Sequence, residues 1–243
     1  MTRASTFVAV NTTAEHPVRA RLAQWPYDAD VAHVVLLDHH MVPDRDHVES
    51  WIDEARAQRA TTLRTGALFP PSTPAFVAAG FEVIDTLSLL ELDLARPADD
   101  RTGPAARLRR LRPTQIDEAA GVDSRAFPAP WANNPAALRD IITATPRFRA
   151  RCIHRDGRMV AFSISGRAST WGYVQRLAVD PSARRRGLAR LLVTDAIDWM
   201  RRRNVERVLV NTATDNTAAL ALYRSLGFVE RPERLKILER SLR

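Results

Sequence analysis

The residues between Asp180 and Leu188 have the types and spacing of an anion-binding turn. They read Pro181-Ser-Ala-Arg-Arg-Arg-Gly187 and lead straight into an apolar stretch with helical spacing. The N-terminus of a helix carries four backbone N–H groups without an intrahelical partner and the positive end of the peptide dipole. A turn in this place can wrap a pyrophosphate, and Gly187 would let the backbone approach the ligand closely. An arginine-rich surface turn is the plainer alternative.

Periodicity predicts the elements that must hold this turn in position. We expect an apolar strand over residues 173–180 and a largely buried helix over 187–203. A second strand and a short helix that stops at Leu226-Gly227-Phe228 should follow. The elements expected upstream are a strand over 107–112, helices over 114–127 and 135–145, and a hairpin of 148–155 and 159–166 turned at Asp156-Gly157.

This order of elements resembles the acetyl-CoA-binding half of the GNAT superfamily of N-acetyltransferases. The family signature is Arg or Gln, two residues, Gly, one residue, then Gly or Ala, and Arg184-Arg-Arg-Gly187-Leu-Ala189 fits it. The preceding Leu177-Ala-Val-Asp-Pro181 matches the family strand that lies beside the thioester. The resemblance covers about residues 107–239 and implies an α/β fold with a mixed central sheet flanked by helices.

The resemblance also implies the residues that hold acetyl-CoA (coenzyme A with its acetyl group). The strand would pair with the pantetheine arm, the turn would hold the phosphates, and the asparagine that opens the short helix would touch the pantetheine. The cofactor-binding residues predicted in this way are Leu177, Ala178, Val179, Arg184, Arg185, Arg186, Gly187, Leu188, Ala189 and Asn216.

Tyr223 is the residue that the resemblance implies as general acid. It lies seven residues after Asn216, two helical turns on and on the same face. When an amine attacks a thioester, backbone donors can stabilise the oxyanion and a phenol can protonate the departing thiolate. A core aromatic just before a helix stop is the alternative interpretation of Tyr223.

No cysteine or Ser-His pair is placed for a covalent intermediate, which favours direct attack in a ternary complex.

The loop over residues 125–131 resembles the substrate-side loop of the ribosomal-protein alanine N-acetyltransferases. Phe127 and Trp131 would then bind the acceptor amine, although both could serve packing alone. In those relatives a glutamate five residues before the helix asparagine helps to deprotonate the amine. Asn211 occupies that position here, and an amide cannot take a proton. Gln175 could instead order a water that relays the proton, so the general base stays open.

The first half of the chain shows a second, weaker copy of the layout. A helix over 48–60, a strand over 61–66, the stretch Pro74–Phe81 and a strand through Leu94 parallel the end of the second half. Phe76 falls where Tyr223 falls, and no glycine precedes Gly66 to form a phosphate turn. We therefore predict a tandem GNAT-like fold whose N-terminal copy is shortened and degenerate; an unrelated α/β lid is the alternative. The predicted domains are 1–95, a linker over 96–106, and a catalytic domain over 107–243.

Charge divides the chain at the same boundary. Residues 1–95 hold 7 Arg and 13 acidic residues, a net −6, whereas residues 96–243 hold 29 basic and 15 acidic residues, a net +14, out of +8 for the chain. Arginine exceeds lysine 35 to 1, which suggests a GC-rich genome more than phosphate contacts, so nucleic acid is not an expected partner. No stretch is apolar enough for a membrane helix or a signal peptide, and we expect a cytoplasmic protein.

The remaining candidate groups indicate structure more than chemistry. Cys152, the one cysteine, has apolar neighbours typical of a buried thiol. The cluster His39, His40, Asp44, Asp46 and His47 has no zinc spacing, so no metal is predicted.

Taken together, the motifs and the resemblance predict an acetyl-CoA-dependent N-acetyltransferase acting on a peptide or protein N-terminus or on a small amine. A non-catalytic acyl-CoA-binding module, with a regulatory or partner-docking first half, is the alternative.

Overall fold

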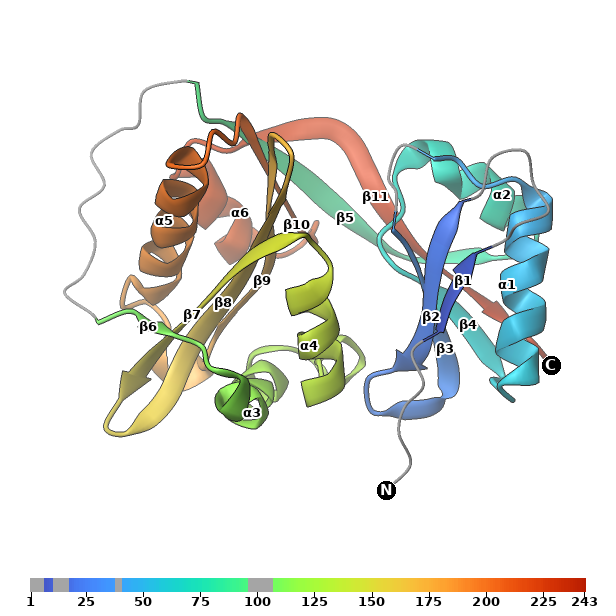
Figure 1. Cartoon of the computed structure of the whole chain (residues 1–243), viewed down its shortest axis with the longest axis horizontal. Coiled ribbons are helices and arrows are strands. Elements are labelled where there is room, and N and C mark those ends of the chain that lie inside the picture. The colour runs from blue at the N-terminus through green and yellow to red at the C-terminus, as the bar shows by residue number, and fades with distance from the viewer. Residues whose placement is uncertain (1–6, 11–17, 38–40, 96–106) are drawn as a thin grey trace. The chain divides into compact units, whose positions relative to one another are not determined.

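The computed structural model describes residues 7–10, 18–37, 41–95 and 107–243 (Figure 1). The predicted linker over 96–106 lies outside the described residues. The chain forms two compact units: residues 1–89, 213–215 and 232–243 make the first, and residues 90–212 and 216–231 make the second. This division differs from the predicted domains, because residues 213–215 and the end of the chain belong to the first unit and residues 90–95 belong to the second.

The second unit is built on a mixed sheet with the strand order β5-β10-β9-β8-β7-β6. β10 runs parallel to β9, whereas β9, β8, β7 and β6 are successively antiparallel. The bounds are β5 Glu82–Asp93, β6 Arg109–Arg110, β7 Arg147–Arg155, β8 Arg158–Ala168, β9 Trp171–Val179 and β10 Arg207–Ala213.

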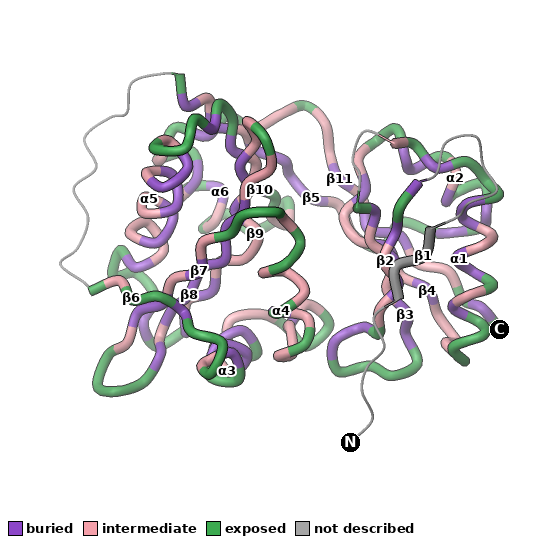
Figure 2. Tube along the Cα trace, in the orientation of Figure 1, coloured by how far each residue is buried: buried purple, intermediate pink, exposed green. Residues whose placement is uncertain are grey.

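Helices cover both faces of this sheet. Neighbouring strand residues point to opposite faces, and Phe162 packs in a cluster with α3 and α4 while Ala161 packs in a cluster with α5. The helix α5 is largely buried, as predicted: one side is buried against the sheet and the other is of intermediate exposure (Figure 2). The helices are α3 Ile116–Ala126, α4 Pro135–Thr143, α5 Leu188–Arg201 and α6 Thr217–Arg224.

The predicted hairpin and helices of this unit are confirmed, and the predicted first strand is too long. The hairpin turns at Asp156 and Gly157, with φ of +50° and +77°. The strand expected over 107–112 is reduced to the two residues of β6. After β6 the N–H of Leu111 still donates to the carbonyl of Ala150 at 3.1 Å, and the chain then enters the short 3₁₀ turn η2, Pro113–Gln115. Cys152 is fully buried, as expected, and burial raises its pKa to about 11.

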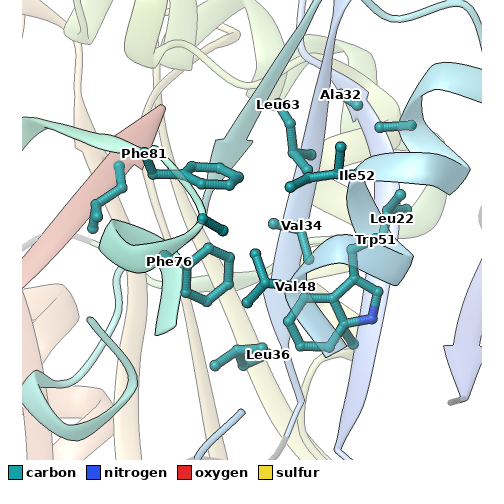
Figure 3. Packing of buried hydrophobic residues seen from close by; sticks show 14 of the residues in the cluster. Leu22, Ala32, Val34, Leu36, Val48, Trp51, Ile52, Leu63, Phe76 and Phe81 are labelled. Atoms are coloured by element: carbon teal, nitrogen blue, oxygen red, sulfur yellow. The ribbon is translucent and has the colours of Figure 1, made fainter. Parts of the chain in front are cut away.

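The first unit has the strand order β1-β2-β3-β4-β11. Its elements are β1 Phe7–Val10, β2 Arg19–Trp25, β3 Asp28–Leu36, α1 Arg45–Ala57, β4 Thr62–Thr65, η1 Pro70–Ser72, α2 Thr73–Ala78 and β11 Val229–Ser241. Trp51 of α1 stacks on Phe76 of α2 at 5.9 Å, over a floor of strand side chains such as Val34 and Leu63 (Figure 3).

The predicted repeat is confirmed by matching local geometry. β3 and β4 are parallel and joined through α1, as β9 and β10 are parallel and joined through α5. In each copy an aromatic ring near the end of the short helix meets the phenylalanine five residues later edge-on: Phe76 with Phe81 at 5.2 Å and Tyr223 with Phe228 at 5.6 Å. Gly80 and Gly227 stop the two helices with φ of +81° and +88°. The alternative of an unrelated lid is therefore wrong.

The strand that follows each short helix ends in the other unit: β5, after α2, ends in the second unit, and β11, after α6, ends in the first. The C-terminal part of β11 pairs with β4 of the first unit, with Glu239 opposite Arg64 and joined to it by an ion pair. The end of β5 lies in the second unit, where the N–H of Leu94 donates to the carbonyl of Glu206 at 2.8 Å. Strand periodicity predicts that a strand forms but not which edge it joins, so this exchange could not be anticipated.

Candidate active site

An arginine turn, residues 180–187, joins β9 to α5. Its first part is the 3₁₀ turn η4, Pro181–Ala183. Gly187, the N-cap of α5, has φ +74°, a conformation that glycine adopts without steric cost, and Arg185 has φ +61°. No described residue accepts a hydrogen bond from the backbone N–H groups of Arg185, Arg186 or Gly187. With the free N–H groups that begin α5, they form a site suited to an anion.

Asp180 fixes the start of the arginine turn. Its Oδ1 accepts hydrogen bonds from the Ser182 hydroxyl at 2.7 Å and the Ser182 N–H at 3.0 Å. Its Oδ2 accepts from Nε of Arg125, on α3, at 2.6 Å. The hydrogen bonds from Ser182 and Arg125 favour the carboxylate and lower the pKa of Asp180 from 3.8 to about 2. The turn is thus held by protein contacts of its own.

We expect Asp180→Asn to lower the free energy of unfolding at neutral pH, because the amide loses its ionic contact with Arg125. A carboxyl whose folded pKa is depressed contributes stability above its unfolded pKa and loses it as pH falls through the folded pKa. The difference in unfolding free energy between the two proteins should therefore shrink as pH falls from about 4 to about 2. Denaturant unfolding followed by circular dichroism measures it, and a difference independent of pH would contradict this role.

The arginines of the turn differ in their contacts. Nη2 of Arg184 donates to the carbonyl of Ala126, at the end of α3, at 3.0 Å, and its Nε donates to the carbonyl of Val179 at 3.5 Å. Arg184 therefore points back to the protein. Arg185 and Arg186 are exposed, so their side chains are the ones that a phosphate in the turn could reach without breaking a protein contact.

Beside the turn, β9 has a free edge. It pairs with β10 only over residues 171–173 and 207–209. On its other edge β9 continues along β8, where the N–H of Asp180 donates to the carbonyl of Val160 at 2.9 Å. Hydrogen-bonding directions alternate along an antiparallel strand, so the backbone groups of Leu177 and Val179 point away from β8. No described strand pairs with them there.

Helix α6 begins at Asn216 and carries Tyr223. Oδ1 of Asn216 accepts a hydrogen bond from the N–H of Ala219 at 3.1 Å and caps the helix. Tyr223 is 5% exposed and packs against Phe228. Desolvation raises the pKa of the Tyr223 phenol well above its usual 10.0. The phenol therefore stays protonated, and able to donate, at neutral and moderately alkaline pH.

The structure places all the predicted cofactor residues within the second unit, on three of its segments: the end of β9, the turn with the start of α5, and the start of α6. Ala178 and Leu188 are buried. The backbone groups of Ala178 face β8, so of these two residues only Leu188, through its N–H at the start of α5, can meet a ligand. Asn211, on β10, is exposed.

Gln175 lies at a β-bulge in β9. A register shift opposite Ile164 and Ser165 leaves Gln175 without a cross-strand partner. Its Oε1 is buried and has no hydrogen-bond partner in the described structure. A side chain at Gly166 would collide with Thr145 and Gln175, so the glycine leaves room for these polar groups. A buried acceptor of this kind requires a water or a ligand group as donor.

The loop over 125–131 places Phe127 and Trp131 close to β9. The guanidinium of Arg176 lies over the Phe127 ring, 3.5 Å from its centroid. Nη2 of Arg176 donates to the carbonyl of Trp131 at 2.8 Å. Both aromatic side chains are half-buried. One face of the Phe127 ring is therefore covered by the guanidinium of Arg176.

Two residues of this site escaped the sequence analysis, Asp123 and Arg176. Asp123 on α3 is 0% exposed, and its carboxylate accepts two hydrogen bonds from Arg176, at 2.7 and 2.6 Å. Arg176 stands in the otherwise apolar end of β9, next to Leu177, and Asp123 follows the apolar run Ala119 to Val122 of α3. Since a charged side chain on a buried face needs a partner, this pattern was the available signal.

The first unit lacks these features at the equivalent helix. Asp44 caps α1 and its carboxylate accepts from the N–H of His47 at 2.9 Å, so a side-chain anion occupies the helix start that Gly187 leaves open in α5. The hydrogen bonds that Asp44 accepts from the N–H and from the ring of His47 lower the pKa of Asp44. Phe76, which has no hydroxyl, stands at the place of Tyr223. Within the described ranges no group of three metal-ligating side chains occurs; His39 and His40 lie outside them.

The fold and this site define an acyltransferase of mixed α/β architecture. The family model "Acetyltransferase (GNAT) family" matches residues 118–228. The [ribosomal protein bS18]-alanine N-acetyltransferase of Escherichia coli is 32% identical over 120 residues, 49% of this chain and 78% of the relative. The chain belongs to the GNAT family of acetyltransferases.

Two further comparisons concern specificity and architecture. N-alpha-acetyltransferase 30 of Saccharomyces cerevisiae is 41% identical over 111 residues, 43% of this chain and 57% of the relative. The structure of a tandem GNAT protein from the clavulanic acid biosynthesis pathway superposes with a TM-score of 0.65 at 21% identity, over 96% of this chain and 82% of that one. This likeness supports the tandem fold predicted above.

Among the described residues no helix is both long and apolar enough to cross a membrane.

Proposed function

We propose that this protein transfers the acetyl group of acetyl-CoA to a primary amine by direct attack in a ternary complex. The observation that carries the proposal is the arrangement around β9: a free strand edge, a glycine turn with unpartnered N–H groups, and a buried, protonated Tyr223. The thioester of acetyl-CoA supplies an activated acyl carbon. Residues 107–243 would carry the reaction, and residues 1–95 would not bind the cofactor.

The chain's own groups would act in sequence along this arrangement. The N–H groups of residues 185–187 and of the start of α5 bind the pyrophosphate. The outward N–H groups of Leu177 and Val179 hold the pantetheine and stabilise negative charge on the carbonyl oxygen. The amine nitrogen bonds to the acyl carbon, the carbon–sulfur bond breaks, and Tyr223 gives its proton to the sulfur and regains one from solvent.

The proton of the amine would leave through water rather than through a carboxylate. Asn211 stands on the acceptor side but has no basic atom. The buried Oε1 of Gln175 can hold a water in place, and that water would accept the proton and pass it to solvent. Phe127 and Trp131 would contact the acceptor.

Two kinds of acceptor fit this proposal. Relatives whose names include ribosomal protein bS18-alanine and N-alpha acetylation favour a peptide or protein N-terminus, a reaction that would take place in the cytoplasm. The absence of a carboxylate at Asn211 favours a small amine that reaches the site already deprotonated. The two are separated by offering both classes to the purified protein.

The test is thiol release from acetyl-CoA against a panel of peptides with free N-termini and of small amines, with CoA binding measured by calorimetry. We expect turnover with at least one amine and a stoichiometry of one CoA per chain, because Asp44 fills the helix start of the first unit. CoA binding without turnover for any amine would support the non-catalytic module instead. Two CoA per chain would refute the assignment of the cofactor to the second unit.

A further inference from the structure

The loop over residues 125–131, here the acceptor loop, is fastened to the acetyl-CoA side of the second unit. Arg176 reaches it from β9, between Gln175 and the free-edge residue Leu177. One nitrogen of Arg176, Nη2, bonds both Oδ1 of Asp123 at 2.6 Å and the carbonyl of Trp131 at 2.8 Å. A single guanidinium thus joins α3, the end of the loop and the strand beside the thioester.

The contacts of Arg176 depend on its planar guanidinium group. Nε and Nη2 bind the two oxygens of Asp123 side by side, and the flat face of the guanidinium covers the Phe127 ring at 3.5 Å. The pair is withdrawn from solvent, with the Asp123 side chain 0% and the Arg176 side chain 16% exposed. The N–H of Asn133, just beyond the loop, also donates to Oδ1 of Asp123 at 2.6 Å. Both flanks of the acceptor loop are therefore oriented by one ion pair.

We infer that Arg176 is a positioning residue that sets the acceptor loop against the thioester strand and so determines how the amine is bound. The inference rests on the proposed function for its substrate. Arg176 does not touch the reacting atoms; it acts through Phe127 and Trp131. Displacements of about 1 Å in such a wall can cost about 100-fold in rate. The arginine turn is held through Arg125 and Ala126, the last two residues of α3. These contacts lie before the part of the loop, Phe127 to Trp131, that Arg176 holds.

Arg176→Lys tests this inference. Lysine keeps the positive charge that the buried Asp123 needs, but it cannot make the bidentate bond or the flat stack. We expect KM for an acceptor amine to rise about 10- to 100-fold, with KM for acetyl-CoA near the wild-type value. An unchanged KM for the amine, or equal rises for both substrates, would overturn the inference.

Arg149→Lys is the matched control. Arg149 on β7 makes a similar bidentate pair with Asp195 on α5, at 2.6 and 2.8 Å, with side-chain exposures of 21% and 16%, and no bond to the acceptor loop is found within the described contacts. We expect a similar loss of melting temperature in both variants and a change of acceptor KM only in Arg176→Lys. The same kinetic change in Arg149→Lys would show a general effect of weakened packing and would overturn the inference.

A second readout does not need turnover. Chymotrypsin cuts after exposed aromatic residues, and a loosened loop should be cut faster after Trp131, giving fragments 1–131 and 132–243 by mass spectrometry. Faster cleavage in Arg176→Lys than in Arg149→Lys supports the inference, and equal rates overturn it. If the wild type acetylated no amine, the proposed function would fail while this measurement still decided the role of Arg176.

Should Arg176→Lys not fold, the paired variant Asp123→Leu/Arg176→Met replaces both charges by apolar side chains of similar size, a change that buried ion pairs often tolerate. The expected and the contradicting outcomes are the same.

Discussion

Tyr223→Phe is expected to reduce kcat by about 100- to 10,000-fold, the range that a positioned proton donor contributes, while the affinity for acetyl-CoA stays at the wild-type level. The fold should tolerate the change, because Phe76 fills the equivalent place in the first unit with the same edge-on contact to a following phenylalanine. Only the hydroxyl is removed. The measurement is steady-state turnover with the best amine of the panel, beside calorimetric titration with CoA.

The pH dependence of kcat provides a second test of the role of Tyr223. Since burial raises the pKa of Tyr223 above 10.0, the acid form is retained through the usual titration range of tyrosine, and kcat of the wild type should not fall between about pH 8 and pH 10. The control is Tyr173→Phe, a half-buried tyrosine where β9 still pairs with β10. Wild-type turnover in Tyr223→Phe, or an equal loss in Tyr173→Phe, would remove Tyr223 from the mechanism.

The second unit was predictable because its chemistry is local in the sequence. A glycine with positive φ at the start of a helix, and a tyrosine two turns after an N-cap asparagine, are read from spacing within short segments. The hairpin at Asp156 and Gly157 is likewise set by a two-residue turn. These parts of the structure needed no information on distant contacts.

What escaped prediction depends on pairing between distant segments. The separation of β9 from β10 after residue 173 follows from the register of two strands about 35 residues apart, and the exchange of β5 and β11 from a choice between sheet edges. The ion pair of Asp123 and Arg176 joins residues 53 positions apart. The sequence alone does not predict that these two charged residues form an ion pair, because only the folded chain brings them together.

The first half of the chain shows how a copy of this fold can persist without the site. Its described residues form a packed hydrophobic core around Trp51 and Phe76 (Figure 3). Its helix start is capped by its own carboxylate, and its aromatic residue has no proton to give. Packing constrains both copies in the same way, whereas binding needs a glycine and a hydroxyl that packing does not require.

Gly187→Val is expected to weaken CoA binding by at least about 100-fold, equivalent to about 2.7 kcal/mol. A β-branched residue is disfavoured at φ +74°, and its side chain would stand at the helix start, whose free N–H groups are proposed to bind the pyrophosphate. The strain alone costs about 1–2 kcal/mol of stability. Calorimetric titration with CoA at a temperature well below unfolding separates the loss of affinity from the loss of stability.

Gly157→Val supplies the matched backbone change. Gly157 has φ +77° in the β7–β8 hairpin, and a Cβ there would meet no atom within 4 Å. The two variants therefore carry the same conformational strain, but only Gly187 lies in the arginine turn. We expect Gly157→Val to lose a similar amount of stability and to bind CoA as the wild type does. Equal affinities in the two variants would mean that the arginine turn does not hold the phosphates, whereas a selective loss in Gly187→Val ties cofactor binding to the helix start that Asp44 closes in the first unit.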